Sequence, residues 1–154
     1  MLECEVRTCT VAEIFDDPDA AELIAEYSEE CAIGLLGRPA PERERYEGLD
    51  GTGFAQCFAA RHGGQLCGFA MVRIAVVPHY GMASATVESL FVSRRVRHLG
   101  LGTELMHAIE AHARRCECEV IFYTAPVFSR LDLLLNMRPA EYQLTNHVVT
   151  KRLG

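Results

Sequence analysis

The stretch Val87–Thr103, VESLFVSRRVRHLGLGT, governs the interpretation of the whole chain. Apolar residues dominate its first six positions and favour a strand. Basic side chains then gather at a turn, namely Arg94, Arg95, Arg97 and His98. Gly100 and Gly102 follow, and without a Cβ they let the backbone approach a ligand closely. A helix that begins there offers amide N–H groups without intrahelical partners, so the stretch predicts a site for a pyrophosphate-sized anion.

Two well-known phosphate-binding loops do not match these glycines. A P-loop requires a lysine after its last glycine, but Gly102 is followed by Thr103. A dinucleotide-binding Gly-x-Gly-x-x-Gly loop requires a third glycine at the position of Leu105. That loop also follows the first strand of its domain, whereas this one lies past the middle of the chain.

A third pattern, [Gln/Arg]-x-x-Gly-x-[Gly/Ala], fits residues 97–102, Arg-His-Leu-Gly-Leu-Gly. This segment resembles the acyl-CoA signature of the GCN5-related N-acetyltransferases, the GNAT superfamily. The resemblance is sharp from Val87 to about Ala111 and extends in layout from Val6 to Lys151. It implies that acetyl-CoA donates the acetyl group and that an amine attacks the thioester directly, without a covalent enzyme intermediate.

The resemblance also implies where this co-substrate binds. The backbone of Phe91 and Val92 would pair with the pantetheine arm, and Phe128 would pack against it. The pyrophosphate would lie against Arg97, His98, Leu99, Gly100, Leu101, Gly102 and Thr103. Arg94 or Arg95 would reach the adenosine phosphate by charge. A tight strand-to-helix turn with exposed arginines is the simpler alternative.

Three residues are candidates for the proton transfers. Family members often carry a glutamate on this strand, so the resemblance makes Glu88 the candidate general base, acting directly or through a water. A solvent-facing Glu88 without a catalytic role is the alternative. The tyrosine that many members use as general acid has no counterpart, because Leu134 or a neighbour occupies its position. Tyr142 and Ser129 are the candidate replacements, and Tyr123 or water remains open.

Composition sets limits on the class of protein. A chain of 154 residues with 49% hydrophobic residues is expected to form a single domain, residues 1–154. Its net charge of −6 argues against nucleic-acid binding, and no apolar run is long enough for a membrane span. The odd number of seven cysteines and the absence of an N-terminal export signal favour a cytoplasmic location. We expect no metal, because His112, Cys116 and Cys118 lack a fourth ligand.

The remaining sequence predicts alternating strands and helices. Strands are expected over Glu3–Thr10, Phe54–Arg61, Leu66–Val77, Ser84–Val92 and Val120–Thr124, with one or two more within Glu141–Lys151. Helices are expected over Asp16–Gly34, Leu101–Cys116 and Phe128–Asn136. This order predicts an α+β (mixed α/β) fold, in which a mixed, mostly antiparallel sheet of six to seven strands is flanked by helices and contains one βαβ crossover. The C-terminal strands would offer an edge for a homodimer.

The favoured function is an N-acetyltransferase that acts on a primary amine of a small molecule or a peptide. The alternative is a GNAT-like module that binds acyl-CoA with weak or no catalysis, as a sensor or an interaction partner; a longer acyl donor is a third hypothesis. The polar segment Arg38–Gly53 is either a solvated connector or a loop that lines the substrate. It carries no recognisable code, so the sequence leaves the identity of the amine open.

Overall fold

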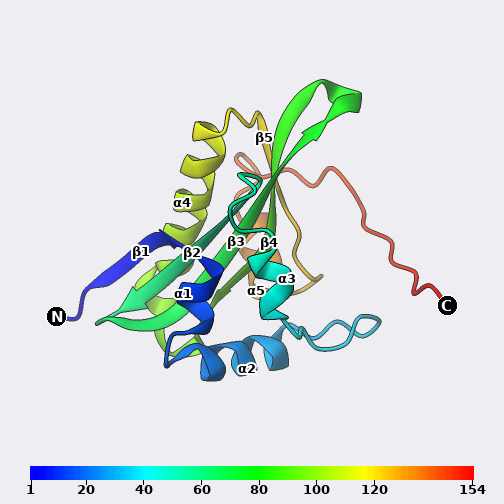
Figure 1. The fold of residues 1–154 in the computed structure, drawn as a ribbon. Coiled ribbons are helices and arrows are strands. Elements are labelled where there is room, and N and C mark those ends of the chain that lie inside the picture. Colours follow the sequence, from blue (N-terminus) through cyan, green and yellow to red (C-terminus); the bar gives the residue numbers. More distant parts are fainter.

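A five-stranded sheet forms the centre of the computed structural model, which describes residues 1–154. The strands lie side by side in chain order: β1 (Cys4–Cys9), β2 (Ala55–His62), β3 (Gln65–Val77), β4 (Met82–Val92) and β5 (Val120–Tyr123). Neighbouring strands are antiparallel except β4 and β5, which are parallel and are joined by helix α4 (Leu101–Arg115) (Figure 1). These observations confirm the mixed α/β fold with one βαβ crossover.

The sheet has five strands rather than six or seven, because residues 141–151 form none. After Tyr142 the chain continues as an extended tail that stands away from the body (Figure 1). The apolar side chains of the tail stay exposed, including Val148 and Val149. Strand propensity alone does not form a strand, since the backbone N–H and C=O groups also need a partner along a sheet edge. The predicted C-terminal strands are therefore wrong.

Helices cover both faces of the sheet. On one face lie α1 (Val11–Phe15), α2 (Ala20–Glu30) and α3 (Arg43–Glu47), and on the other lies α4 (Figure 1). Two short 3₁₀ helices and a last α-helix complete the chain: η1 (Pro78–Tyr80), η2 (Arg94–Leu99) and α5 (Arg130–Asn136). None of the helices combines the length and the apolar composition that a bilayer crossing requires.

The N-terminal helical region differs from the predicted helix over Asp16–Gly34. A separate helix, α1, begins at Val11, because the Thr10 hydroxyl accepts from the Glu13 N–H while the Glu13 carboxylate accepts from the Thr10 N–H. The second helix, α2, ends at Glu30. The predicted C-terminal end at Gly34 instead falls within a turn closed by the Ile33–Gly37 bridge.

Two apolar clusters hold the layers together and fix β4 from both sides. Leu105 and Ile109 of α4 pack in one cluster, to which β4 contributes Val87. The other cluster lies beneath α1 and α2 and contains Phe69 of β3 and Phe91 of β4. Because each fully buried side chain of this size contributes about 1.5–3 kcal/mol, the packing gives β4 a firm position. The candidate site is built on this strand.

Candidate functional site

A β-bulge in β4 places Glu88 and Ser89 on the same face of the sheet. Val87 pairs with Val72, and Ser89 pairs with Met71, so Glu88 is the extra residue between two pairs. Val87 packs in the cluster beneath α4, whereas Glu88 and Ser89 both line cavities on the opposite face. Regular strand alternation would send two consecutive side chains to different faces. The bulge therefore lets Glu88 and Ser89 both face α2 and α3, and it puts Val87 and Phe91, four residues apart, on opposite faces of the sheet.

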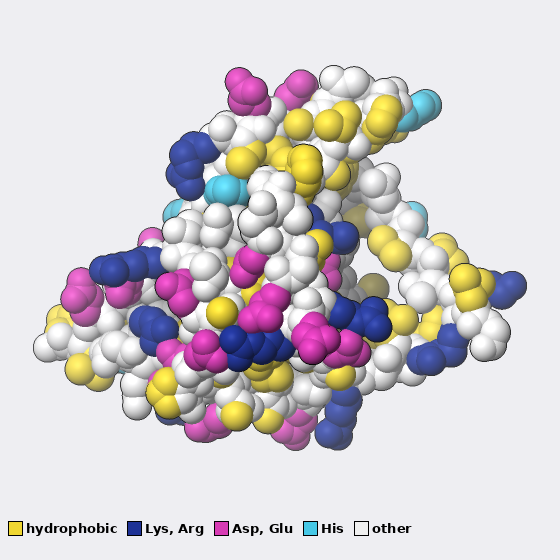
Figure 2. Space-filling view, viewed as in Figure 1, with side chains coloured by type: hydrophobic (Ala, Val, Ile, Leu, Met, Phe, Trp, Pro, Cys, Tyr) yellow, Lys and Arg dark blue, Asp and Glu magenta, His cyan; other side chains and the backbone are white.

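The Glu88 carboxylate lines a cavity of about 490 Å³. The other walls come from α2, α3, β3 and the segment just before α3, and they include Tyr27, Tyr46 and Arg73. Over this face acidic and basic side chains are interspersed (Figure 2). Part of the segment Arg38–Gly53, between Pro39 and Leu49, thus lines the cavity, and its contact with a substrate stays a prediction.

Glu88 is accessible within the cavity and carries one ion pair. Its Oε2 lies 3.0 Å from Nε of Arg73, and 35% of the Glu88 side chain is exposed. A carboxylate that is reachable from solvent and held by one neighbour can accept a proton from a bound group. Sequence reasoning missed Arg73, although a charged residue within the apolar run of β3 was a signal for it.

Two phenols, neither of them predicted, lie on the same face as Glu88. The pKa of Tyr27 is raised to about 12, mainly by burial and also by the charges of Tyr46, Cys31 and Glu88. Burial also raises the pKa of Tyr46, and the Glu88 charge adds to this effect. Both hydroxyl groups therefore stay protonated near neutral pH and can donate a hydrogen bond or a proton into the cavity.

The parallel strands β4 and β5 separate beside the cavity. Their pairing begins at Ser84 and Val120 and ends at Val87 and Tyr123. Residues 88–92 of β4 keep β3 on one side and have no strand on the other. One edge of β4 is consequently open next to Glu88.

The register shows which backbone groups face this open edge. The Ser93 N–H donates to the Cys67 carbonyl at 2.8 Å, and such bonds alternate along an antiparallel ladder. The N–H and C=O groups of Phe91 therefore face β3, whereas those of Leu90 and Val92 face the open edge. The Phe91 side chain packs beneath α2 instead, where its ring centre lies 5.4 Å from that of Tyr27.

The turn from β4 into α4 presents free donors. Gly100, the N-cap residue, has a φ of 81°, which side chains rarely tolerate. No side chain caps α4, and its first intrahelical bond runs from the Glu104 N–H to the Gly100 carbonyl at 3.1 Å. The unpaired first-turn N–H groups are those of Leu101, Gly102 and Thr103. A Cβ at Gly102 would have only Val92 Cγ2 near it, at 4.0 Å, so the space outside this helix start is open.

Arg97 fastens this turn to the rest of the molecule. Its Nε donates to the Val92 carbonyl at 2.9 Å, and a terminal nitrogen bonds to Glu30 at 2.6 Å. Its guanidinium also lies over the Phe91 ring, 5.4 Å from the ring centre. The cation of Arg97 is thus directed at the protein, and this residue orients the loop.

Glu26 on α2 holds the start of η2. Its carboxylate accepts from the Ser93 hydroxyl at 2.9 Å and from the Arg94 N–H at 2.8 Å. Burial alone would raise the pKa of Glu26, but the bonds from Arg94 and Ser93 outweigh it and lower the pKa. Arg95 and His98, by contrast, are exposed and remain free to meet an anion at the start of α4.

The structure keeps Tyr142 apart from Glu88. The Tyr142 hydroxyl donates to Glu110 Oε1 at 2.8 Å, and the Tyr123 hydroxyl donates to the same oxygen at 2.9 Å. Tyr123 packs against the cluster beneath α4, so this group lies on the face opposite to the Glu88 cavity. Burial and the hydrogen bond to Glu110 together raise the pKa of Tyr142 to about 12.

Ser129 and Phe128 lie at the start of α5. The Ser129 hydroxyl accepts from the Asp132 N–H at 3.2 Å and caps this helix. Phe128 is 84% exposed and has a φ of 66°. Neither residue lines the Glu88 cavity. The sequence-based candidates therefore form two groups: Glu88 on β4 with the residues at the start of α4, and Phe128, Ser129 and Tyr142 beyond β5.

The cysteines and histidines do not assemble a metal centre. His112 Nε2 and Cys116 Sγ lie 3.5 Å apart. No third histidine, cysteine, aspartate or glutamate joins this pair, and no other group of three forms elsewhere in the chain.

Comparison with known proteins gives one family and many similar structures. The model of the acetyltransferase (GNAT) family matches residues 21–129, a range that contains the cavity residues Tyr27 and Glu88 and the start of α4. No curated protein sequence matches the chain.

Three solved structures illustrate the shared fold. A ribosomal-protein-alanine N-acetyltransferase from Brucella melitensis biovar Abortus 2308 has 20% identity and a TM-score of 0.71, covering 99% of this chain and 100% of that one. An aminoglycoside acetyltransferase from an uncultured soil metagenomic sample, in complex with sisomicin, has 15% identity and a TM-score of 0.70, with coverages of 98% and 95%. A transcriptional regulator from Bacillus halodurans C-125 has 16% identity and a TM-score of 0.76, with coverages of 98% and 100%.

Proposed function

The chain belongs to the acetyltransferase (GNAT) family, and from this premise we propose that it transfers an acetyl group from acetyl-CoA to a primary amine. One observation carries the proposal: the open edge of β4 runs from the uncapped start of α4 to Glu88 in the cavity. Glu88 and Val92 are four residues apart, or about 13 Å along an extended strand. The phosphate end and the reactive end of one extended ligand would therefore lie at the two ends of this edge.

The residues at the two ends fit acetyl-CoA. Free first-turn N–H groups, the positive end of the α4 dipole and the exposed Arg95 and His98 suit a diphosphate. Leu90 offers both backbone groups to the amides of the pantetheine arm, as an added strand would use them, and Val92 offers its N–H, since its carbonyl accepts from Arg97. We propose Leu90 rather than Phe91 for this role, because the backbone groups of Phe91 face β3. When bound, acetyl-CoA supplies the activated thioester.

Glu88 is proposed to act on the acceptor. Its carboxylate takes a proton from the ammonium group, directly or through one water, so that the nitrogen lone pair can attack the carbonyl carbon. A C–N bond forms, the nitrogen loses its second proton to water, the C–S bond breaks, and the departing thiolate takes up a proton. Tyr27 and Tyr46 are the hydroxyl groups on the same face that stay protonated and can supply it.

A binding module without turnover is the second candidate, favoured by the absence of a tyrosine at Leu134. The two functions differ in one measurement, the release of CoA thiol when acetyl-CoA is mixed with a panel of primary amines. Thiol release that depends on the amine supports the enzyme. Binding of CoA without such release supports the module. We further propose a cytoplasmic protein, since all seven cysteines are unpaired.

Calorimetry of CoA binding to two Gly102 variants tests the proposed cofactor site. The family pattern accepts alanine at this position, so Gly102→Ala should bind CoA nearly as well as the wild type. Gly102→Val should bind at least ten-fold more weakly, because its branched side chain would fill the space in front of the free N–H groups. Both variants should fold, since nothing lies within 4.0 Å except Val92 Cγ2. Equal CoA affinity in all three proteins would remove the α4 start as the phosphate site.

A further inference from the structure

We propose that the acceptor is a small zwitterionic amine of the amino-acid type, whose carboxylate binds Arg73 while its amine lies at Glu88. This inference rests on the proposed acetyl transfer and names the substrate class of the same site. Two features of the cavity carry it: the cation beside Glu88 and the apolar wall around it.

Arg73 places a cation directly beside the proposed base. Its Nε lies 3.0 Å from Glu88 Oε2, and 52% of its side chain is exposed. Glu88 is its only carboxylate partner, so the two terminal nitrogens are free to bind a second anion. The planar guanidinium can bind a carboxylate through two parallel hydrogen bonds.

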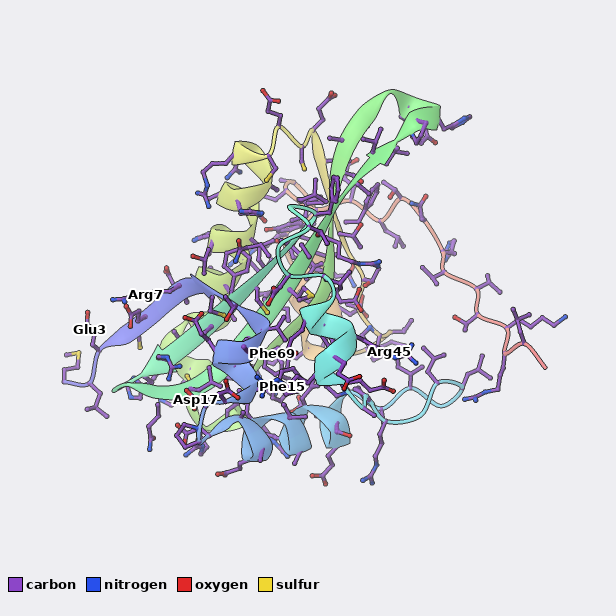
Figure 3. All side chains as sticks on the ribbon, in the orientation of Figure 1. Glu3, Arg7, Phe15, Asp17, Arg45 and Phe69 are labelled. Atoms are coloured by element: carbon purple, nitrogen blue, oxygen red, sulfur yellow. The ribbon has the colours of Figure 1, made fainter.

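The other cation of the cavity, Arg45, pairs with a different carboxylate. Arg45 extends from α3 (Figure 3), and its Nε lies 2.7 Å from Glu42 Oε2. Both side chains are at the solvent-exposed rim, with 82% of Arg45 and 64% of Glu42 exposed. Arg73 is less exposed and is the cation that contacts Glu88, so it is the one placed to bind a group next to the reacting amine.

The Arg73–Glu88 pair imposes a charge rule on the acceptor. An ammonium group that approaches Glu88 must compete with Arg73 for the same carboxylate, and the guanidinium repels it. A carboxylate next to the amine would draw Arg73 to itself and leave Glu88 to the ammonium. A zwitterion pairs with both Arg73 and Glu88. A simple amine or a polyamine leaves its ammonium group in repulsive contact with Arg73, so the site discriminates against such acceptors.

The apolar wall indicates the rest of the acceptor. Tyr27, Tyr46 and Pro41 line both the cavity and a small apolar pocket of about 40 Å³ behind it. Phe15 and Phe69 line the small pocket as well (Figure 3). A side group resting on this wall would be apolar or aromatic, which selects among amino acids.

The test uses three acceptors that share the benzyl group and the primary amine and differ in the carboxylate: L-phenylalanine has it, L-phenylalaninamide has a neutral amide in its place, and phenethylamine lacks the group. At saturating acetyl-CoA we expect L-phenylalanine to have a kcat/KM at least ten-fold above the other two, mainly through KM. Phosphoethanolamine and ethanolamine form a second pair, which shows whether a phosphate can replace the carboxylate. In Arg73→Gln the advantage of L-phenylalanine should vanish, and Arg73→Lys should restore part of it. Arg7→Gln, which removes an exposed arginine from β1 (Figure 3), is the matched control and should keep the wild-type ratio.

The outcomes separate this inference from the proposed function. Equal use of all three acceptors by the wild type, or an equal loss of all three in Arg73→Gln, would overturn the inference while acetyl transfer stands. Calorimetry of acceptor binding in the presence of CoA gives a readout without turnover. Carboxylate-dependent binding that Arg73→Gln abolishes, without thiol release, would support the inference and overturn the transfer reaction. If neither binding nor turnover favours the acceptor with a carboxylate, Arg73 does not bind the substrate carboxylate.

Discussion

At the scale of single residues, Glu88 is the extra residue of the bulge in β4 and the proposed general base. Without the bulge, strand alternation would be unbroken from Val87 to Val92, and Val87 and Phe91 would lie on the same face of the sheet. With it, Val87 packs beneath α4, Phe91 packs beneath α2, and Glu88 faces the cavity beside Arg73 as the extra residue between them. A single backbone irregularity thus separates the packing role of β4 from its proposed chemical role.

Replacing Glu88 by glutamine should remove the proposed base with little change in shape. We expect kcat to fall by about 10²–10⁴, the usual contribution of a general base, while the affinity for acetyl-CoA stays within two-fold. Steady-state thiol release and calorimetry measure the two quantities. Glu119→Gln, an exposed change before β5, is the control. An unchanged kcat in Glu88→Gln would exclude this residue as the base.

Phenylalanine variants distinguish the three candidate phenols. Tyr142→Phe should keep wild-type turnover, because the Tyr142 hydroxyl is bonded to Glu110 on the opposite face. Tyr27→Phe or Tyr46→Phe should lower kcat about ten-fold or more if the proton comes from the cavity. Since burial raises the pKa of Tyr27 to about 12, activity should not decline up to about pH 10, where an ordinary tyrosine titrates. A loss of kcat in Tyr142→Phe alone would instead identify Tyr142 as the proton donor.

At the scale of elements, α2 and η2 form one unit that presents the start of α4. Glu26 binds Ser93 and Arg94, and Glu30 binds Arg97. These bonds link residues 67 or 68 positions apart in the chain, so no local pattern could reveal them. They explain why the basic turn keeps one arrangement in which the first N–H groups of α4 stay open.

Removing this link should affect both stability and CoA binding. Glu26→Ala leaves the Ser93 hydroxyl and the Arg94 N–H without their partner, which should cost about 1–3 kcal/mol of unfolding free energy. Urea denaturation at pH 7 measures the loss, and CoA affinity should fall with it. Glu29→Ala, an exposed change on the same helix, should cost less than about 0.5 kcal/mol.

The lowered pKa of Glu26 determines how its contribution to the free energy of unfolding changes with pH. The folded-state pKa lies below the unfolded one, because the bonds from Arg94 and Ser93 outweigh the effect of burial. The contribution of Glu26 is therefore complete above about pH 4.3, the ordinary glutamate value, and is lost as the pH falls through the folded-state pKa. The difference in unfolding free energy between the wild type and Glu26→Ala should therefore become smaller over that acidic range. A difference that stays constant with pH would contradict this explanation.

At the scale of the whole molecule, the tail and the body are weakly joined. Tyr142, just before the tail, bonds to Glu110 of α4. Within the tail, Arg152 bonds to the Leu35 carbonyl at 2.8 Å. The tail side chains that stay exposed are Leu144, Val148, Val149 and Leu153. In the space-filling view the tail stands off the body (Figure 2).

Truncation after Tyr142 should therefore be nearly neutral. We expect the unfolding free energy of a chain lacking residues 143–154 to stay within about 0.5 kcal/mol of the wild type, because that segment buries little. A chain truncated after Asn136 also loses Tyr142 and should be less stable. Urea unfolding measures both, and sedimentation of the same samples tests the homodimer that was expected from the C-terminal residues. A large loss on removing only residues 143–154 would show that the tail packs in solution.

The sequence by itself determined the five strands that form, the βαβ crossover and the loop at Gly100 and Gly102. These depend on local signals, namely apolar periodicity and glycines beside a basic turn, which act within a few residues. The predicted strands over residues 141–151 failed because pairing requires a neighbour, and propensity does not supply one.

Only the tertiary structure decided what surrounds Glu88. The bulge, the Arg73 ion pair and the walls from Tyr27 and Tyr46 join four separate elements, so their spacing along the chain carries no trace of their contact. The tertiary structure also placed Tyr142 on the opposite face, because the position of a side chain after β5 depends on which layer it packs against. Local periodicity fixes which segments become strands and helices, whereas long-range packing fixes which of their side chains meet.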